Sequence, residues 1–591
     1  LERGLGFFGL AHFFIWFLML VSVFKIDEKN LNFAFSSSAS ASGKKDKSFL
    51  KISQQGFFKK DFKNQPFSRR LIIFSVFVSA AISFLAIGQH FFSLGDLLPQ
   101  NTRSYSLIGN AGLLGSYLLF NVFFAIYLFL VSEKKIKWFW AAGIFVIILA
   151  LFLTGTRGAY LGLFLGFFVF LVMVAWRAPQ KKWQRGAVAF LGIIMVLGGV
   201  LFWARQSAVV KNNFVFSRLS AISWQETTAQ NRLILWQSAW RAWQEKPFLG
   251  WGGENFEVAI NKYFDPRLTF FEAWYDRAHN FIFDYGVTLG YLGLFSYLLI
   301  MGLAFYQLLK QIKTDFFLAA SFLALLTAYL VQNFFIFDSF VSYLMLFFVL
   351  AVIDSSNFLL GPLLSLGKKA KEEGALIFDE KSRAWKNSNF SEKPKTLALP
   401  FYKKIILLFF GGFLFFVSYN FNLKPLLAAH YANKILSLET EQADEILPYF
   451  KEVLALKPVR LDEIVYQVVL DYKEKINQNP ALAQNEEFYN LAKEQLEKGI
   501  KRPSFELKNS LALAWLNLYF SGQNKARLAD SLKLAQRVLK LAPGRKDGYL
   551  LLVAGYVLSG ETEKAQQIVD LAISLNDKMG EEIKKYYERL K

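Results

Sequence analysis

Cysteine is absent from the 591 residues of this chain, and histidine occurs only four times. Without cysteine the chain has no disulfide framework, no thiolate nucleophile and no cysteine-based metal site. The histidines are His12, His90, His279 and His430, and no two of them stand at the spacing of a zinc-binding pair. We therefore expect neither a metal centre nor another cofactor.

Acidic residues are also fewer than basic ones, 46 against 67, which gives a formal net charge of +21. Such an excess can indicate nucleic-acid binding, but no basic stripe lies on a segment with the composition of a soluble fold. The lysines and arginines cluster instead in short loops between apolar runs, which is the pattern that the positive-inside rule produces in membrane proteins. We therefore expect no nucleic-acid partner.

Apolar residues dominate the composition. Hydrophobic residues make up 54% of the chain, phenylalanine occurs 65 times, and the mean hydropathy is +0.30. About ten apolar runs approach the length that crosses a bilayer as a helix; they cover residues 4–24, 71–94, 103–131, 138–153, 160–176, 186–204, 287–309, 316–337, 340–363 and 401–419. The sequence predicts an all-α, polytopic membrane protein with a soluble helical tail.

The basic clusters set the predicted orientation. They lie in alternate loops, at residues 44–70, 134–137, 177–185, 310–313 and 368–395, and we place these loops in the cytoplasm. Four regions follow: a first span and basic loop over 1–70, a membrane domain over 71–363 with an outward loop over 204–285, a linker and last span over 364–420, and an outward helical domain over 426–591. The polar residues of interest then share the outer face.

The tail, residues 426–591, alternates apolar and charged residues at helical period. Six of its apolar residues fall at the spacing of a tetratricopeptide repeat with Gly560 in the turn; they are Tyr549, Leu552, Tyr556, Ala565, Val569 and Ala572. The array is irregular, so we describe it as TPR-like. It either offers a groove to a partner or substrate chain or acts as a stabilising helical cap.

Three residues of the outward face suit chemistry on an anionic substrate. His279 is the one histidine in the outward loop, and an unperturbed pKa of about 6.5 suits a general base, although a lone histidine is more often structural. Arg157 lies between two apolar runs, where it either faces a polar site or anchors a helix at the interface. Arg232 begins an amphipathic segment that suits a bilayer surface. Converging arginines match the oxygens of a diphosphate in a bidentate manner.

Other residues of the loop compete for these roles. The carboxylates that could replace His279 as the base are Glu254, Asp265, Asp276 and Asp284. The glycine-rich stretch PFLGWGGENF, residues 247–256, follows no strand and lacks a Lys-Ser/Thr ending. We therefore interpret it as a tight turn and not as a Walker-type phosphate loop.

Four segments together resemble the O-antigen ligase and polymerase family of bacterial envelope glycosyltransferases. They are RSYSLIGNAGLLGSYL from Arg103, LTGTRGAYLGL around Arg157, NRLILWQSAWRAWQEKPFLGWGGENF from residue 231, and AHNFIFDYGVTLGYLG around His279. The likeness covers about residues 70–360. It departs from the family at residues 109–112, which read Gly-Asn-Ala-Gly where the family often has Gly-Asn-Pro-Asn.

The resemblance implies a metal-independent, inverting transfer of a glycan from a polyprenyl diphosphate to an acceptor hydroxyl, on the outer face of a bacterial cytoplasmic membrane. By motif position, Arg157 and Arg232 would hold the diphosphate, with Arg103 as a further candidate, and His279 would take the acceptor's proton. The acceptor, whether lipid, glycan or protein, stays open, as does a protein partner for the tail. The alternative of another class is a membrane transporter or scaffold.

Overall fold

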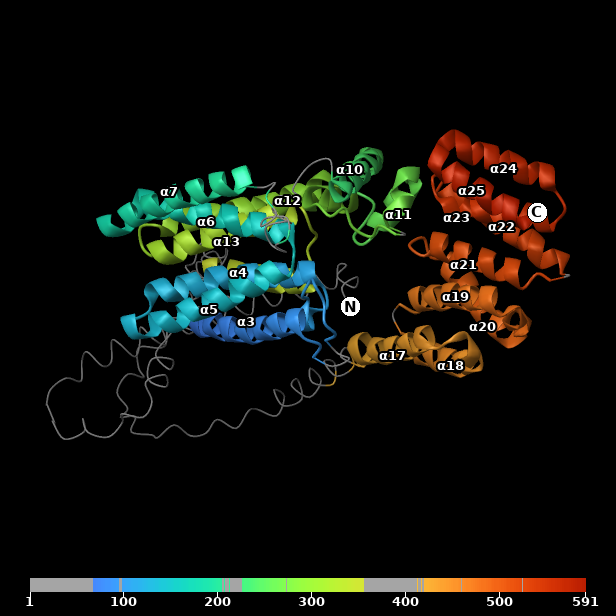
Figure 1. The fold of residues 1–591 in the computed structure, drawn as a ribbon, viewed down its shortest axis with the longest axis horizontal. Helices are drawn as coiled ribbons and strands as arrows, with labels where there is room; N and C mark the ends of the chain where they lie inside the picture. The colour runs from blue at the N-terminus through green and yellow to red at the C-terminus, as the bar shows by residue number, and fades with distance from the viewer. Residues whose placement is uncertain are drawn as a thin grey trace, which may run out of the picture.

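All regular secondary structure is helical in the part of the chain that the computed structural model describes (Figure 1). That part comprises residues 67–94, 98–204, 226–272, 274–354, 419–458, 460–522 and 524–591, with single positions at 207, 212, 412 and 416. The predicted all-α class is confirmed for these residues. The span predicted over 4–24 and the linker 368–395 lie outside the described residues, as do all but three positions of the span 401–419 and nearly all of the basic loop 44–70.

Seven helices among the described residues are long and apolar enough to cross a membrane. They are α3 (Phe67–Phe91), α4 (Ala111–Val131), α5 (Lys134–Leu153), α6 (Arg157–Arg177), α7 (Lys181–Trp203), α12 (Phe281–Gln311) and α13 (Phe316–Asn333). A shorter apolar helix, α14 (Phe340–Asp354), follows α13. All eight coincide with predicted spans, and the chain is a multi-pass membrane protein.

Helix α4 begins at Ala111 and not near Arg103, where the predicted span begins. Asn110 is its N-cap, and the side-chain Oδ1 accepts hydrogen bonds from the backbone N–H groups of Gly112 (2.8 Å) and Leu113 (3.3 Å). A capping asparagine satisfies helix-end donors that otherwise have no partner. The segment before it forms a short 3-10 turn, η2 (Ser106–Ile108).

The core of the bundle lies around α4, the most buried of the seven spans. It packs against α3, α5 and α13, and α13 in turn packs closely on α6. Glycines allow this last approach: a Cβ added at Gly162 would stand 2.6 Å from the carbonyl oxygen of Ala328, and one at Gly166 2.6 Å from that of Ala324. Small residues at such contacts are typical of membrane helix pairs.

Helix α12 is interrupted at Gly290, whose backbone is left-handed (φ 67°). The glycine-rich turn fits into the interruption: the N–H of Trp251 donates to the Val287 carbonyl (2.8 Å), and the N–H of Tyr291 donates to the Pro247 carbonyl (2.7 Å). A Cβ at Gly290 would lie 2.3 Å from the Phe248 carbonyl oxygen, so only glycine fits there. The predicted tight turn is confirmed, and it fills the break in a membrane helix.

The outward loop folds into a small helical unit. Its helices are α10 (Thr227–Glu245), α11 (Phe256–Lys262) and the 3-10 turn η4 (Pro266–Phe270). The apolar side chains of Leu235, Ala239 and Trp243 on α10 are buried in a core shared with α11 and the start of α12. These three side chains therefore do not lie on a bilayer surface as expected, because they pack in that shared core, whereas Trp240 of the same predicted face is 43% exposed.

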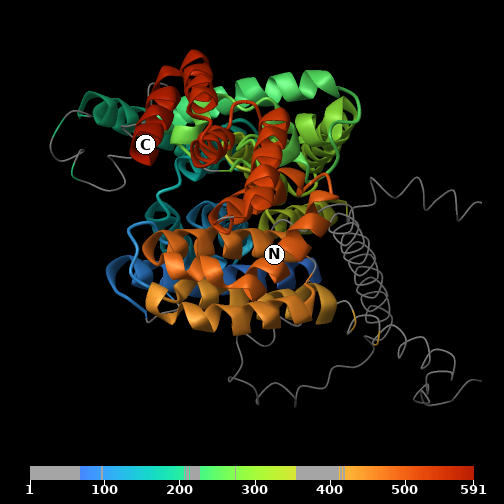
Figure 2. The ribbon, with the colours of Figure 1, turned by 90° about the vertical axis from the view of Figure 1, so that its right-hand side faces the viewer.

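The tail consists of consecutive helices paired antiparallel and stacked in one row (Figures 1 and 2). Its helices are α17 (Lys424–Ser437), α18 (Ile446–Leu456), α19 (Leu461–Gln478), α20 (Glu486–Ile500), α21 (Glu506–Tyr519), α22 (Lys525–Leu541), α23 (Lys546–Leu558), α24 (Thr562–Leu575) and α25 (Asp577–Leu590), with short helical turns η5 (Tyr419–Leu423), η6 (Thr440–Glu445) and η7 (Pro480–Gln484). Paired helices occur where they were predicted, and their assignment as TPR-like repeats stays a prediction.

The loop helices and the tail lie together at one end of the bundle, and Figure 2 shows the tail (orange to red) standing in front of the loop helices (green). The turns between spans meet at this end as well: the N–H of Ser104 donates to the Leu153 carbonyl (3.1 Å), and Phe337 packs against His279. The predicted gathering of these segments on one face is confirmed. That this face lies outside the membrane stays a prediction from the basic loops.

Candidate active site

Arg157 is the first residue of α6, directly after the TGT turn that ends α5. Its guanidinium forms an ion pair with the carboxylate of Glu226, the residue that precedes α10. Both side chains are about a quarter exposed, at 26% and 29%, so the pair lies at the edge of the protein interior. The pair joins the start of the loop helices to the end of a membrane helix 69 residues earlier in the chain.

Arg103 lies against the same turn. Its Nε donates to the backbone carbonyl of Thr154 at 3.3 Å, and the residue itself is exposed. The neighbouring Ser104 holds the loop in place through its bond to Leu153. Arg103 thus bonds to the turn that directly precedes Arg157, although 51 positions separate Arg103 from Thr154.

Arg232 lies in the second turn of α10, with Arg157 close enough to act on it. Burial lowers the pKa of Arg232, the carboxylate of Glu272 opposes this shift, and the positive charge of Arg157 adds to it. Two cations close together in a partly buried place repel each other, and an anion bound between them would offset that repulsion. The guanidinium groups can meet an anion through paired N–H donors.

His279 lies two residues before α12, with its backbone in the left-handed region (φ 49°). A residue other than glycine is strained there, and such strain is found at functional sites. The imidazole ring packs edge-on against Phe337, with the ring centres 5.3 Å apart. Burial, and to a smaller extent the charge of Arg232, lower the pKa of His279 to about 4, while the charge of Asp276 opposes both effects. The imidazole is therefore neutral at pH 7 and has a nitrogen free to accept a proton.

Hydrogen bonds hold the backbone on both sides of His279. The indole Nε1 of Trp236 on α10 donates to the Ala278 carbonyl (2.9 Å), and the Ala278 N–H donates to the carboxylate of Asp284 (2.9 Å). Asn280 caps α12 by accepting from the N–H of Ile282 (2.8 Å). The position of the histidine is thus fixed by α10 and α12 together.

Arg277 is a largely buried cation of this site, with its side chain 15% exposed, that the sequence did not single out. It pairs with Glu254 at 2.7 Å and with Asp284 at 3.7 Å. Burial alone would lower its pKa, but the two carboxylates raise it above its ordinary value. A basic residue two positions before the candidate histidine, in a loop that re-enters the membrane, was the available signal.

The ion pairs of this region distinguish between the four carboxylates that could replace or assist His279. Glu254 and Asp284 are engaged by Arg277, and Asp265 pairs with Arg267 at 2.7 Å. Asp276 is the carboxylate of this set whose charge acts on His279 in the direction that raises its pKa. Among the four, Asp276 is therefore the one placed to assist the histidine.

A buried carboxylate directly follows Phe337, the residue whose ring packs on His279. Asp338, in the turn between α13 and α14, accepts hydrogen bonds from the Tyr329 hydroxyl (2.8 Å), the Asn333 amide (2.9 Å) and the Ser342 hydroxyl (2.9 Å). Burial raises its pKa, and these donors partly offset the shift. The network fixes the turn that carries Phe337, the ring packed on His279.

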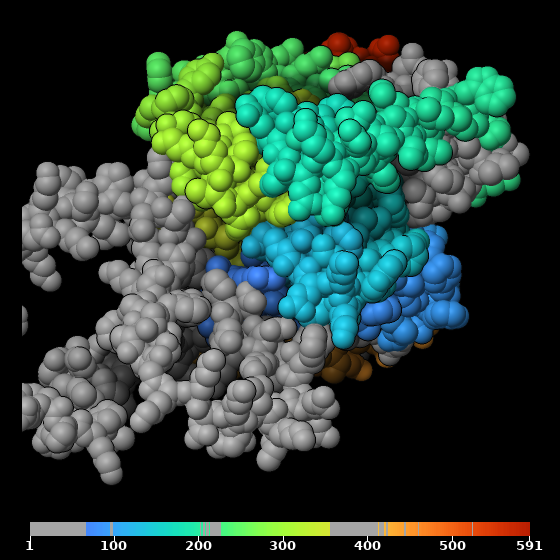
Figure 3. Space-filling model, turned by 90° about the vertical axis from the view of Figure 1, so that its left-hand side faces the viewer, coloured from blue at the N-terminus to red at the C-terminus, as the bar shows by residue number. Residues whose placement is uncertain are grey.

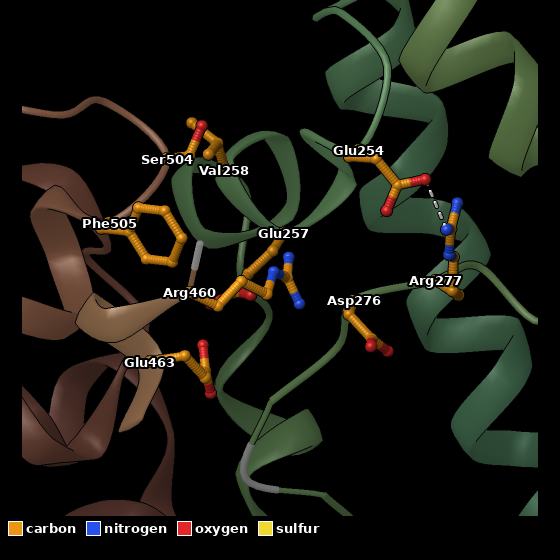
Figure 4. Close-up of a pocket in the computed structure, with 9 residues that line it drawn as sticks. All are labelled: Glu254, Glu257, Val258, Asp276, Arg277, Arg460, Glu463, Ser504 and Phe505. Carbon is orange, nitrogen blue, oxygen red and sulfur yellow. Dashed lines mark hydrogen bonds and ion pairs between the residues drawn. The ribbon is translucent and has the colours of Figure 1, made fainter. Parts of the chain in front are cut away.

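A small polar cavity of about 40 Å³ lies where the loop unit meets the tail (Figure 4). It is lined by Glu254, Glu257, Val258, Asp276 and Arg277 of the loop and by Arg460, Glu463, Ser504 and Phe505 of the tail. Beside it the buried Lys508 of the tail bridges Glu257 and Glu463 at 3.0 Å each. A space of this size holds a few water molecules and no sugar ring.

Residues 142–298 match the sequence profile of the O-antigen ligase family. This part of the chain belongs to the O-antigen ligase family. The matched segment contains Arg157, Arg232 and His279, whereas Arg103 and the tail lie outside it. The three residues that interact electrostatically in the structure are thus all within the O-antigen ligase segment.

Two curated proteins are similar to the chain. An uncharacterized protein of Haemophilus influenzae is 21% identical over 261 residues, which is 43% of this chain and 63% of that protein. A general O-oligosaccharyltransferase of Acinetobacter baylyi is 24% identical over 216 residues, which is 36% of each chain. The chain thus spans less than two thirds of the length of either relative.

Proposed function

We propose that the protein is a glycosyltransferase that moves a glycan from a polyprenyl-diphosphate donor to an acceptor hydroxyl on the outer face of the cytoplasmic membrane. The O-antigen ligase segment and the similarity to an O-oligosaccharyltransferase support glycan transfer as the reaction class. The observation that carries the proposal is that Arg157 and His279, from two other parts of the chain, both lie close enough to Arg232 of α10 to interact with its charge.

In the proposed reaction the two arginines bind the diphosphate of the donor. The acceptor oxygen attacks the anomeric carbon from the side opposite the diphosphate, so a carbon–oxygen bond to the acceptor forms as the bond to the phosphate oxygen breaks. The configuration of that carbon is inverted. The polyprenyl diphosphate leaves with the bonding electron pair, and Arg157 and Arg232 stabilise the charge that develops on it.

His279 receives the proton of the acceptor hydroxyl in this scheme. The imidazole is neutral before the donor binds, because burial and Arg232 keep its pKa low, at about 4. A bound diphosphate places negative charge beside Arg232, which offsets that residue's effect on the histidine and raises the pKa toward the operating pH. A base whose pKa lies closer to the operating pH transfers protons more effectively.

The direct test is transfer by purified protein from a polyprenyl-diphosphate-linked oligosaccharide, with a chelator present. Wild type and His279→Ala are compared, and the mass of the product identifies the acceptor. Transfer by the wild type that is lost in the variant supports a metal-independent reaction with His279 as the base. Equal transfer by both proteins assigns the histidine a structural role and directs attention to Asp276.

Transport is the alternative that one observation favours, because interrupted membrane helices often form transport sites, and α12 is interrupted at Gly290. In this protein the glycine-rich turn fills the interruption and pairs with its backbone groups. The backbone groups around the interruption that could otherwise bind a transported ion are therefore already hydrogen-bonded to the turn. Movement of labelled polyprenyl-linked glycan across vesicles without any transfer product would favour transport over the proposed enzyme.

A further inference from the structure

A wholly apolar groove lies between α6 and α7. Its volume is about 370 Å³, and its lining is formed by Phe164, Leu165, Phe168 and Val172 of α6 and by Leu191, Ile194, Met195 and Gly198 of α7. The space-filling view from the end opposite the tail shows α6 and α7 (teal) at the outside of the bundle (Figure 3). Helix α7 is almost unburied along its span and packs chiefly on α6, so the groove is open to the bilayer.

The groove lies on the same face of α6 as Arg157. Phe164, Phe168 and Val172 follow Arg157 by close to two, three and four helical turns, since an α-helix takes about 3.6 residues per turn. At a rise of about 1.5 Å per residue, the groove extends from roughly 10 Å to roughly 22 Å below the arginine. The opposite face of α6, with Gly162 and Gly166, is buried against α13.

We propose that this groove binds the polyprenyl chain of the donor, with the diphosphate at Arg157; the inference rests on the proposed function. One helix then carries the cation for the anionic head at its end and the apolar surface for the chain below it. The chain enters sideways from the bilayer along the open edge of α7. A diacyl lipid should bind this groove no more tightly than other apolar surfaces, because its headgroup offers no diphosphate to Arg157.

The physical benefit of the groove is alignment and not water exclusion. Lipid tails are as apolar as the groove, so moving a chain from the bilayer into it yields no hydrophobic gain. A chain held along α6 instead restricts how the diphosphate and the anomeric carbon are presented to the site, and such orientation lowers a reaction barrier. We therefore expect groove variants to have moderate effects that depend on chain length.

Two glycines on α7 provide a matched pair of variants. A Cβ at Gly198 or at Gly192 meets no atom within 4 Å, so a side chain can begin at either position without a clash. Gly198 lines the groove and Gly192 does not. Gly198→Leu should raise the KM for a long-chain donor about five- to tenfold, and should leave the KM for a donor with a two-unit prenyl chain unchanged. Gly192→Leu should change neither value. An equal effect of Gly198→Leu on both donors, or no effect on either, overturns the proposal.

Photolabelling tests the groove independently of transfer. A long polyprenyl diphosphate with a diazirine midway along its chain is added to wild-type protein in nanodiscs, and the labelled peptides are sequenced. Labelling of residues 164–172 and 191–198 that unlabelled polyprenyl diphosphate prevents and phospholipid does not is the expected result. Labelling elsewhere, or equal labelling by a diacyl phospholipid probe, would overturn the proposal that the groove binds the polyprenyl chain. Specific labelling without any transfer would count against the proposed enzyme alone.

Discussion

The guanidinium carbon of Arg545 lies 3.6 Å from the ring centre of Trp274. Arg545 belongs to the tail and Trp274 to the outward loop, five residues before His279. The same arginine donates to the side-chain oxygen of Asn261 at 3.2 Å, and the Trp274 ring meets that of Tyr466 edge-on at 5.8 Å. The tail therefore holds the loop segment that leads from Trp274 to His279, the candidate base. Its role is not limited to binding a partner.

Replacing Arg545 with alanine should loosen this segment. A desolvated cation–π contact contributes about 2 kcal/mol, and loss of the bond to the buried Asn261 costs about 1–3 kcal/mol more. We expect faster amide hydrogen exchange over residues 274–279 and a fall in kcat on the order of tenfold, with a smaller change in the donor KM. Arg537→Ala, which removes a half-exposed ion pair with Glu506, is the control. Unchanged exchange in the Arg545 variant would show that the loop holds its own shape.

Arg157→Lys should impair transfer strongly even though the charge is kept. Lysine offers a point charge in place of the planar fork that meets two phosphate oxygens, and each hydrogen bond to a charged group contributes about 1.5–3 kcal/mol. We expect kcat/KM for the donor to fall by at least tenfold. Arg177→Lys, at the other end of the same helix, is the control. Normal transfer by Arg157→Lys would refute the bidentate contact.

Glu226→Gln should have the opposite effect on donor binding. The carboxylate of Glu226 pairs with Arg157 in the structure, so an incoming diphosphate has to compete with it. Because both side chains are partly exposed, solvent screening limits the pair to about 1 kcal/mol or less. The donor KM should therefore fall by a few-fold at most, which is measured as initial rates against donor concentration. A rise in KM would instead make Glu226 a group that positions Arg157.

The pH dependence of transfer should differ between kcat/KM and kcat. The profile of kcat/KM reports the free enzyme, in which the pKa of His279 is lowered to about 4, first by burial and then by Arg232. Its acidic limb should lie near that value, because the base is neutral above it. The acidic limb of kcat should lie at higher pH, because the bound diphosphate raises the pKa of the histidine.

Arg232→Gln tests whether the acidic limb of kcat/KM belongs to His279, because it predicts the direction in which that limb should move. Removing a positive charge favours protonation of His279, so the acidic limb of kcat/KM should move to higher pH in the residual activity of this variant. Arg241→Gln, on the exposed side of the same helix, should leave the limb in place. A limb that stays fixed in both variants would mean that a group other than His279 is being titrated.

Much of the candidate site could be predicted because membrane topology constrains it. Arg103, Arg157, Arg232 and His279 were placed on one face by counting spans and basic loops, and the described residues confirm that their segments meet at one end of the bundle. The buried contacts that hold the backbone around His279 in place were not predicted. Arg277 and Asp338 act through partners that are distant in sequence or in other helices, and a single sequence does not show such pairings.

The sequence by itself determined the class, the spans among the described residues and the candidate residues, because apolar length and loop charge follow directly from the cost of placing polar groups in a bilayer. Tertiary structure alone decided that one side of α10 is buried against α11 and α12, that the turn at residues 247–252 fills the break at Gly290, and that Arg545 reaches Trp274. These outcomes depend on which apolar and charged surfaces meet, and local periodicity carries no information about the partner surface.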